Sequence, residues 1–183
     1  MTDFLQEHPN GQVIASDEMS LYFQATTTRL WSGVGQTPIV RVTPQRDPTH
    51  FYGALNLRNG HEMSLTFSHQ NSETTAIFLS HLLFCYPSQP ILLLWDRASW
   101  HKGEAVQRVL RGNPRLQTLF FPPASPDLNP QEHVWSQARA AVSHNHNFIR
   151  FDLLVKAFLD HLSKTLFRFD WLDKYAPSTL CQS

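Results

Sequence analysis

Three acidic residues in this sequence could carry out metal-assisted chemistry together. Asp17 and Asp96 each follow a run of apolar residues typical of a strand, and Glu132 lies at the start of a predicted helix. Carboxylate oxygens are ligands that Mg²⁺ prefers, and such ions keep several waters and bind substrate phosphates. Two ions held about 3.5–4 Å apart can activate an attacking water or 3′-hydroxyl and stabilise the leaving oxygen at phosphorus. The three acids therefore predict a two-metal phosphoryl-transfer site.

Each acid taken alone also has a purely structural explanation. An aspartate directly after a strand is often just the first solvated residue, which would account for Asp17 or for Asp96. Glu132 could complete a capping box, with Asn129 as N-cap, Pro130 as the first helical residue and the carboxylate reaching back to the Asn129 N–H. The combination of the three acids, none with an obvious salt-bridge partner, favours the metal site.

Two neighbouring acids are weaker candidates. Side chains on a strand alternate between the faces of a sheet, so Glu18 is not expected to point at the same ion as Asp17. Asp127 lies in a proline-rich turn, which its side chain is expected to fix by an Asx-type bond. The helix that carries Glu132 is expected to leave it outside an apolar stripe of Val134, Ala138, Ala141 and Val142.

Hydrophobic periodicity and turn residues predict the elements that would position these acids. We expect strands at residues 13–17, 21–24, 51–57, 62–68, 91–95 and 118–121, a turn at 31–35, and a hairpin turn at Asn59-Gly60. We expect helices at residues 74–84 and 103–110, a helix from Gln131, and a last helix with Asp152 as its N-cap. Antiparallel strands followed by strand–helix alternation indicate an α/β fold, a mixed sheet with helices on both faces. In such sheets ligands gather at the carboxyl ends of strands, where we place Asp17 and Asp96.

Length and composition indicate one domain spanning residues 1–183. With 42% hydrophobic residues, the chain is long enough to bury one sizeable core. No apolar run approaches the roughly 18 residues of a membrane span, and the first ten residues lack the pattern of a secretory signal, so we expect a cytoplasmic protein. Cys85 and Cys181 fit no metal-ligand spacing and are interpreted as reduced, incidental thiols.

The charge balance gives no general argument for nucleic acid. The formal net charge is zero, which counts against a protein that must hold DNA unaided. The segment 96–115 is locally basic, because two acids stand against five basic residues: Arg97, Lys102, Arg108, Arg111 and Arg115. Such a run is usually a solvated helix face, and a contact to DNA is the alternative interpretation.

The order of these motifs resembles the catalytic domain of mariner-like transposases in the DDE superfamily, most closely the bacterial insertion-sequence family numbered six-thirty. The resemblance rests on Asp17-Glu18, on the apolar strand ending in Asp96 with His101 five residues later, and on the string Ser125-Pro126-Asp127-Leu128-Asn129-Pro130-Gln131-Glu132-His133-Val134-Trp135. It extends from about residue 13 to about residue 142 and takes in the 31–35 turn and residues 51–54. The spacing between Asp96 and Glu132 also fits that superfamily.

This resemblance implies a ribonuclease-H-like fold in which Asp17, Asp96 and Glu132 bind two Mg²⁺ or Mn²⁺ ions. It implies cleavage at transposon ends followed by strand transfer into target DNA, carried out at the nucleoid by a homodimer on double-stranded DNA. Such transposases carry N-terminal helix-turn-helix domains that recognise the element's ends. Because this chain begins about a dozen residues before its first catalytic strand, we expect those domains to be absent and a separate helix-turn-helix chain to be a candidate partner.

Several other interpretations stay open. His101 either orients Asp96 or the substrate as an auxiliary residue, or is a cap or surface group; Asn129 is a second auxiliary candidate. His144 and His146 are one residue apart, which is more typical of a polar loop than of a zinc site. No GxSxG, P-loop or GxGxxG motif occurs. The rival functions are an inactive transposase remnant that binds or dimerises, and another ribonuclease-H-like nuclease such as a resolvase.

Overall fold

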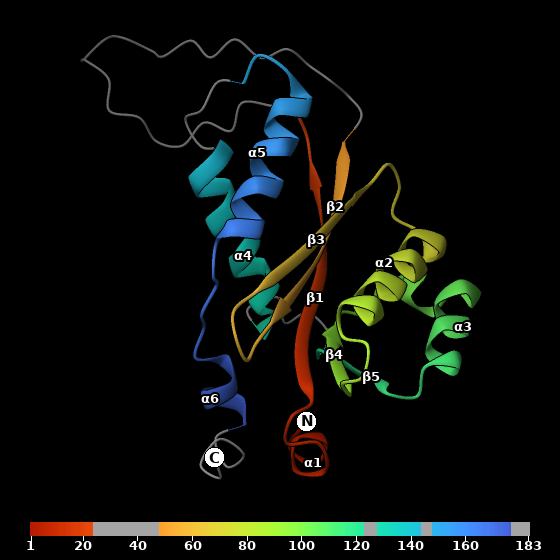
Figure 1. The fold of residues 1–183 in the computed structure, drawn as a ribbon. Helices are drawn as coiled ribbons and strands as arrows, with labels where there is room; N and C mark the ends of the chain where they lie inside the picture. Colours follow the sequence, from red (N-terminus) through yellow and green to blue (C-terminus); the bar gives the residue numbers. More distant parts are fainter. Residues whose placement is uncertain (24–47, 123–127, 144–147, 177–183) are drawn as a thin grey trace.

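A computed structural model describes residues 1–23, 48–122, 128–143 and 148–176. A five-stranded sheet in the order β3-β2-β1-β4-β5 forms its centre (Figure 1). The strands are β1 (Gln12–Leu21), β2 (Thr49–Asn56), β3 (Glu62–Phe67), β4 (Ile91–Trp95) and β5 (Leu116–Phe120). β1 pairs antiparallel with β2 and parallel with β4, so the predicted mixed sheet is confirmed.

The hairpin between β2 and β3 forms at the predicted turn. Gly60 has a φ of 77°, a left-handed conformation that glycine adopts without steric cost. Its N–H donates to the Asn56 carbonyl at 2.8 Å, and the Asn56 N–H donates to the His61 carbonyl at 2.9 Å. The hairpin places Gly53, in the middle of β2, directly opposite Asp17 on β1.

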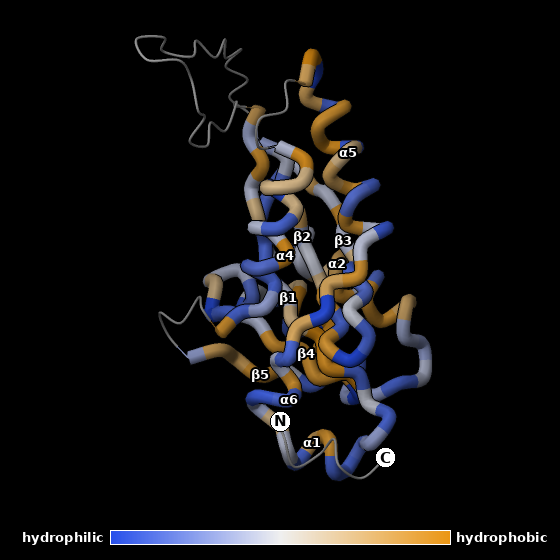
Figure 2. The backbone as a smooth tube through the Cα atoms, turned by 90° about the vertical axis from the view of Figure 1, so that its left-hand side faces the viewer, coloured by the Kyte–Doolittle hydropathy of each residue, from blue (hydrophilic) through white to orange (hydrophobic). Residues whose placement is uncertain are grey.

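Helices cover both faces of the sheet, as the sequence predicts (Figure 1). On one face lie α2 (Ser72–Cys85), the 3₁₀ helix η1 (Ser99–Lys102) and α3 (Glu104–Gly112). On the other lie α4 (Pro130–Ala138), α5 (Phe151–Lys164) and, towards the chain ends, α1 (Thr2–Glu7) and α6 (Trp171–Tyr175). Apolar and polar residues alternate along α5 (Figure 2), whose Leu154, Phe158 and Leu162 are buried at helical spacing.

The first strand is longer than predicted, and Asp17 does not end it. β1 runs on to Leu21, so the expected separate strand at 21–24 does not form over its described residues. The pairing of β1 with β4 stops at Ala15, however, while the pairing with β2 continues to the end of β1. Asp17 therefore lies just beyond the carboxyl end of the parallel pair, and Asp96 directly follows β4.

Two helix predictions need correction. The N-cap of α5 is Arg150, not Asp152; Asp152 lies in the first turn and accepts from Arg150 Nε at 2.9 Å. After α4 the chain forms a π-helix at Arg139–Ser143, which changes the angular spacing of the side chains. Val142 is buried as predicted, but Ala141 is exposed because of that change. No helix in the described ranges has the length and apolar character that a bilayer crossing requires.

Candidate functional site

Asp17 and Asp96 share one face of the sheet. Val13, Met19 and Leu21 of β1 pack in the apolar clusters beneath the α1/α6 and α4/α5 helices, and Asp17 has the same strand parity. Leu92 and Leu94 of β4 pack on that face too, and Asp96 follows them at the same parity. Continuing the Ala15–Leu94 register by two residues brings Asp17 alongside Asp96.

The start of α4 brings Glu132 to the same place. Pro130 occupies the first turn, where its missing N–H costs no hydrogen bond, and the Asn129 side chain accepts from the Gln131 N–H at 3.1 Å. The reciprocal bond expected from Glu132 is absent among the described residues, since only its backbone N–H reaches the Asn129 carbonyl, at 3.2 Å. The carboxylate is exposed, so capping does not account for Glu132.

The neighbouring acids contribute to the raised pKa of Asp17. Burial raises the pKa of Asp17 to about 8, with repulsion from the charges of Glu132, Glu18 and Asp96 adding to the shift. Like charges at short range raise the pKa of a carboxyl because both cannot ionise cheaply. A divalent cation would remove this repulsion, and the all-oxygen donor set of Asp17, Asp96 and Glu132 suits a hard ion such as Mg²⁺ or Mn²⁺.

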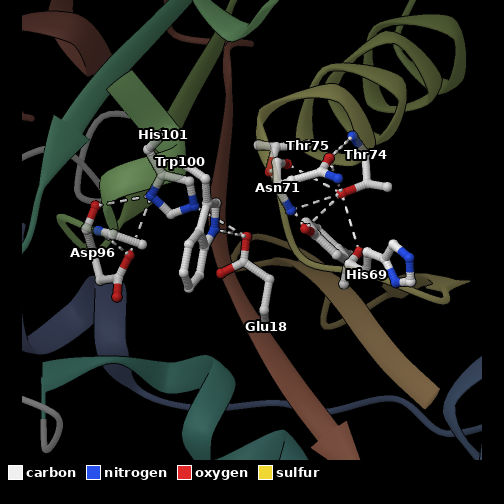
Figure 3. Close-up of polar contacts among 10 residues, drawn as sticks. Glu18, His69, Asn71, Thr74, Thr75, Asp96, Trp100 and His101 are labelled. Carbon is white, nitrogen blue, oxygen red and sulfur yellow. Dashed lines mark hydrogen bonds and ion pairs between the residues drawn. The ribbon is translucent and has the colours of Figure 1, made fainter. Parts of the chain in front are cut away.

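Asp96 does have an ionic partner, contrary to the sequence-based expectation. His101 Nδ1 lies 3.2 Å from Asp96 Oδ1, and the Ala98 N–H donates to the same oxygen at 3.0 Å (Figure 3). The hydrogen bond from His101 lowers the pKa of Asp96. Both contacts use Oδ1, and the Asp96 side chain is 52% exposed. Within the described residues Oδ2 accepts no hydrogen bond, which leaves it available to a ligand.

His101 is buried and contacts both Asp96 and Glu18. The alternative interpretation of His101 as a surface group is therefore wrong. Its ring stacks on Trp95 with centroids 4.1 Å apart, and only 2% of its side chain is exposed. Nε2 donates to Glu18 Oε1 at 3.0 Å, and Trp100 Nε1 lies 3.4 Å from that oxygen (Figure 3). Burial lowers the pKa of His101, but the hydrogen bonds to Asp96 and Glu18 outweigh it and raise the pKa to about 9.

A second possible metal group overlaps the predicted one. Ligand atoms of Glu18, Asp96 and His101 lie within 4.8 Å of one another. Both ring nitrogens of His101 are already bonded to carboxylates, so the protonated imidazole supplies the positive charge that an ion would bring. We interpret this group as an ion-pair network behind Asp96. Glu18 points away from Asp17, as strand alternation requires.

Sequence reasoning missed the part played by Glu62, Gln131 and Gly53. Glu62 Oε1 accepts from Gln131 Nε2 at 2.8 Å, and a Cβ added to Gly53 would lie 2.6 Å from that same oxygen. A glycine inside a predicted strand signals a close approach by another group, and Gly53 carried that signal. Nothing in the sequence pairs Glu62 with Gln131.

Several basic side chains of the segment 96–115 make contacts within the protein. Arg115 donates to the carbonyls of Leu83 and Gln89, each at 2.9 Å. Arg111 pairs with Glu104, and Arg97 lies over the Phe120 ring. These contacts support the structural interpretation of the segment. The 31–35 turn, Asp127, His144, His146 and Cys181 fall outside the described residues, while Cys85 is a free, exposed thiol.

Comparison with known proteins identifies the family of this chain. Residues 12–155 match the family model of the DDE superfamily endonucleases, so the chain belongs to that family. The chain is 27% identical over 144 residues to the insertion element IS630 uncharacterized 39 kDa protein of Shigella sonnei, covering 76% of this chain and 40% of that protein. It is 28% identical over 107 residues to the uncharacterized protein y4pE/y4sA of Sinorhizobium fredii, covering 58% of this chain and 76% of that protein.

Solved structures share the fold. The Mos1 transposase paired-end complex with left transposon end superposes with a TM-score of 0.67 at 17% identity, covering 93% of this chain and 53% of the Mos1 chain. The catalytic domain of the Mos1 mariner transposase gives a TM-score of 0.60 at 16% identity, covering 93% and 78%. The expected ribonuclease-H-like fold and the resemblance to the insertion-sequence and mariner transposases are confirmed. The chain spans 40% of the Shigella relative and about half of the Mos1 chain.

Proposed function

We propose that this chain is the catalytic part of a transposase that cuts DNA at the ends of a mobile element and joins those ends to target DNA. One geometric observation carries the proposal. Asp17 and Asp96 share one face of the sheet, and Gln131, the residue before Glu132, lies directly over Gly53, which pairs with Asp17. The rise in the pKa of Asp17 caused in part by Glu132 and Asp96 is consistent with this arrangement. Relatives are consistent with it, since one is named for an insertion element and Mos1 is described with transposon-end DNA.

Asp17, Asp96 and Glu132 would together hold two Mg²⁺ or Mn²⁺ ions. Such ions, when bound, would lower the pKa of the attacking hydroxyl and offset negative charge on the phosphate. Solved Mos1 complexes with Mg and with Mn support this choice of ions. The chemical step is an in-line displacement. The attacking oxygen bonds to phosphorus and gives its proton to solvent, while the bond from phosphorus to the leaving oxygen breaks and that oxygen takes a proton from solvent.

Two auxiliary residues support the ligands in this proposal. His101 orients Asp96 by holding Oδ1, which would leave Oδ2 for the ion. Asn129 fixes the first turn of α4 through the Gln131 N–H and thus the position of Glu132. Neither residue takes part in the bond exchange itself.

The proposed partners follow from the reaction. The substrates are double-stranded DNA, as terminal inverted repeats and as target, and the active form is a homodimer. Residues 1–183 serve as one catalytic domain, and a separate helix-turn-helix chain is the proposed source of end recognition. Because DNA is the substrate, the proposed place of action is the cytoplasm, at the nucleoid.

Nicking of supercoiled plasmid tests this proposal without knowledge of the cognate ends. We expect the wild-type protein to nick in Mn²⁺, and Asp96→Ala to lose nicking while keeping its fold by circular dichroism. Loss of a metal ligand removes the ion's whole contribution, so the residual rate should be at background. Metal-independent nicking, or equal nicking by both proteins, would refute the assignment. A preference for branched DNA over terminal repeats would point instead to a resolvase.

A further inference from the structure

A buried polar contact connects the hairpin to the first turn of α4. Gln131 Nε2 donates to Glu62 Oε1 at 2.8 Å, and Ser64 Oγ donates to the same oxygen at 2.9 Å. Gln131 is fully buried, and its side chain passes over Gly53, where a Cβ would overlap the amide. The contact thus crosses β2 at the residue that pairs with Asp17.

Two atoms of this contact lack partners. Glu62 Oε2 and Gln131 Oε1 are both buried with no hydrogen bond among the described residues. As a carboxylate, Glu62 would offer only acceptors, leaving both oxygens unsatisfied at a cost of about 1–3 kcal/mol each. Burial raises the pKa of Glu62 to about 8 despite the bonds from Ser64, Gln131 and the Ala54 backbone, which favours the protonated acid. A proton on Oε2 supplies the donor that Gln131 Oε1 needs.

We propose that Glu62 and Gln131 form a buried acid–amide pair over Gly53, which holds the first turn of α4, and with it Glu132, against the strand that carries Asp17. Gln131 is then fixed twice, at its backbone by Asn129 and at its side chain by Glu62. Glu132 is the next residue and has no anchoring side-chain bond in the described part of the chain. Gln131 and Glu62 are positioning residues for the proposed metal site, and this inference rests on that proposed function.

Three variants test the pair. Gln131→Met keeps the side-chain length and removes the amide. Glu62→Gln keeps one acceptor and one donor, so it reproduces the neutral pair. Leu162→Ala, in the α5 cluster, destabilises the same half of the protein without touching the pair, and serves as the matched control.

The first measurement is hydrogen exchange of the Gln131 and Glu132 amides in EDTA, which needs neither metal nor DNA. We expect Gln131→Met to speed exchange about tenfold or more beyond any change in Leu162→Ala, and Glu62→Gln to match the wild type. The second is the Mn²⁺ concentration that gives a half-maximal thermal shift. We expect Gln131→Met to raise it about tenfold, as loss of a supporting residue does at metal sites.

Either of two results overturns the inference: Gln131→Met exchanges like the control, or Glu62→Gln behaves like Gln131→Met, which would mean that a charged Glu62 is required. These results are separate from the proposed function. If the wild type shows no Mn²⁺ response, the transposase proposal fails while the exchange data still decide whether the pair holds α4.

Discussion

Replacing Asp17 by asparagine should stabilise the metal-free protein while destroying its response to metal. The pKa of Asp17 is raised to about 8 in the folded protein, against an ordinary value of 3.8 for an aspartate side chain. The folded state therefore binds more protons than the unfolded state between about pH 4 and pH 8, and stability falls as pH rises through that window. Asparagine is uncharged at every pH, so its advantage grows over the same range.

The size of the effect follows from the shift. The rise in the pKa of Asp17 from 3.8 to about 8, at 1.36 kcal/mol for each tenfold change in proton affinity, sets a ceiling of about 6 kcal/mol on the gain in the free energy of unfolding. Movement of the side chain towards solvent and screening reduce the observable gain, and we expect about 1–3 kcal/mol at pH 8.5 and almost none at pH 4.5. Repulsion among the acids would lower the stability of the metal-free protein, whereas the same acids would be needed to bind the proposed ions.

Urea unfolding in EDTA at pH 4.5 and pH 8.5 measures the gain, and Mn²⁺-induced thermal shift measures the response. Asp160→Asn is the control, because Asp160 is a half-exposed acid that pairs with Lys156 on the same helix, α5. The reasoning is refuted if Asp17→Asn is no more stable than wild type at pH 8.5, or if its advantage is the same at both pH values.

Two further perturbations test the surroundings of the site. His101→Gln should lower the free energy of unfolding by about 2–4 kcal/mol, because it leaves buried Glu18 without its cation. In urea unfolding this loss should be full below about pH 6.5. It should disappear as pH rises through 9, since the pKa of His101 is about 9. A cost independent of pH would contradict this. Gly53→Ala should lower the free energy of unfolding by about 1–3 kcal/mol because the added Cβ overlaps Gln131. Gly112→Ala is the control, because nothing lies within 4 Å of its added Cβ, and it should be neutral or stabilising in the same urea unfolding experiments. Equal effects of the two substitutions would argue against the close approach of Gln131 to Gly53.

The sequence predicted the parts of the fold that local chemistry determines. β4 lies where its continuous apolar run indicated, and Gly60 takes the left-handed conformation expected of an Asn-Gly turn. The helix signal at Asn129-Pro130 was also right. The end of β1 was wrong because a polar Asp17-Glu18 pair resembles a strand terminus. Pairing with β2 carries the strand to Leu21, and that long-range effect leaves no mark on the local sequence.

The three acids could be proposed from the sequence, but their arrangement in space could not. Strand parity correctly separated Glu18 from Asp17, and the charges of Asp96 and Glu132 contribute to the raised pKa of Asp17 in the folded chain. The bridge from Glu18 through His101 to Asp96 joins residues far apart in the chain, and its geometry depends on the stacking of His101 on Trp95. The Glu62–Gln131 contact is likewise tertiary. Such contacts follow from the packing of α4 and η1 on the sheet.

Anomalous diffraction from crystals soaked in Mn²⁺ tests the central claim most directly, because it locates the ion without assuming an activity. The account predicts density in contact with Asp17 and Asp96 on the α4 face of the sheet, with Glu132 completing the site. Density between Glu18 and His101 on the other face, or none at any carboxylate, would contradict it.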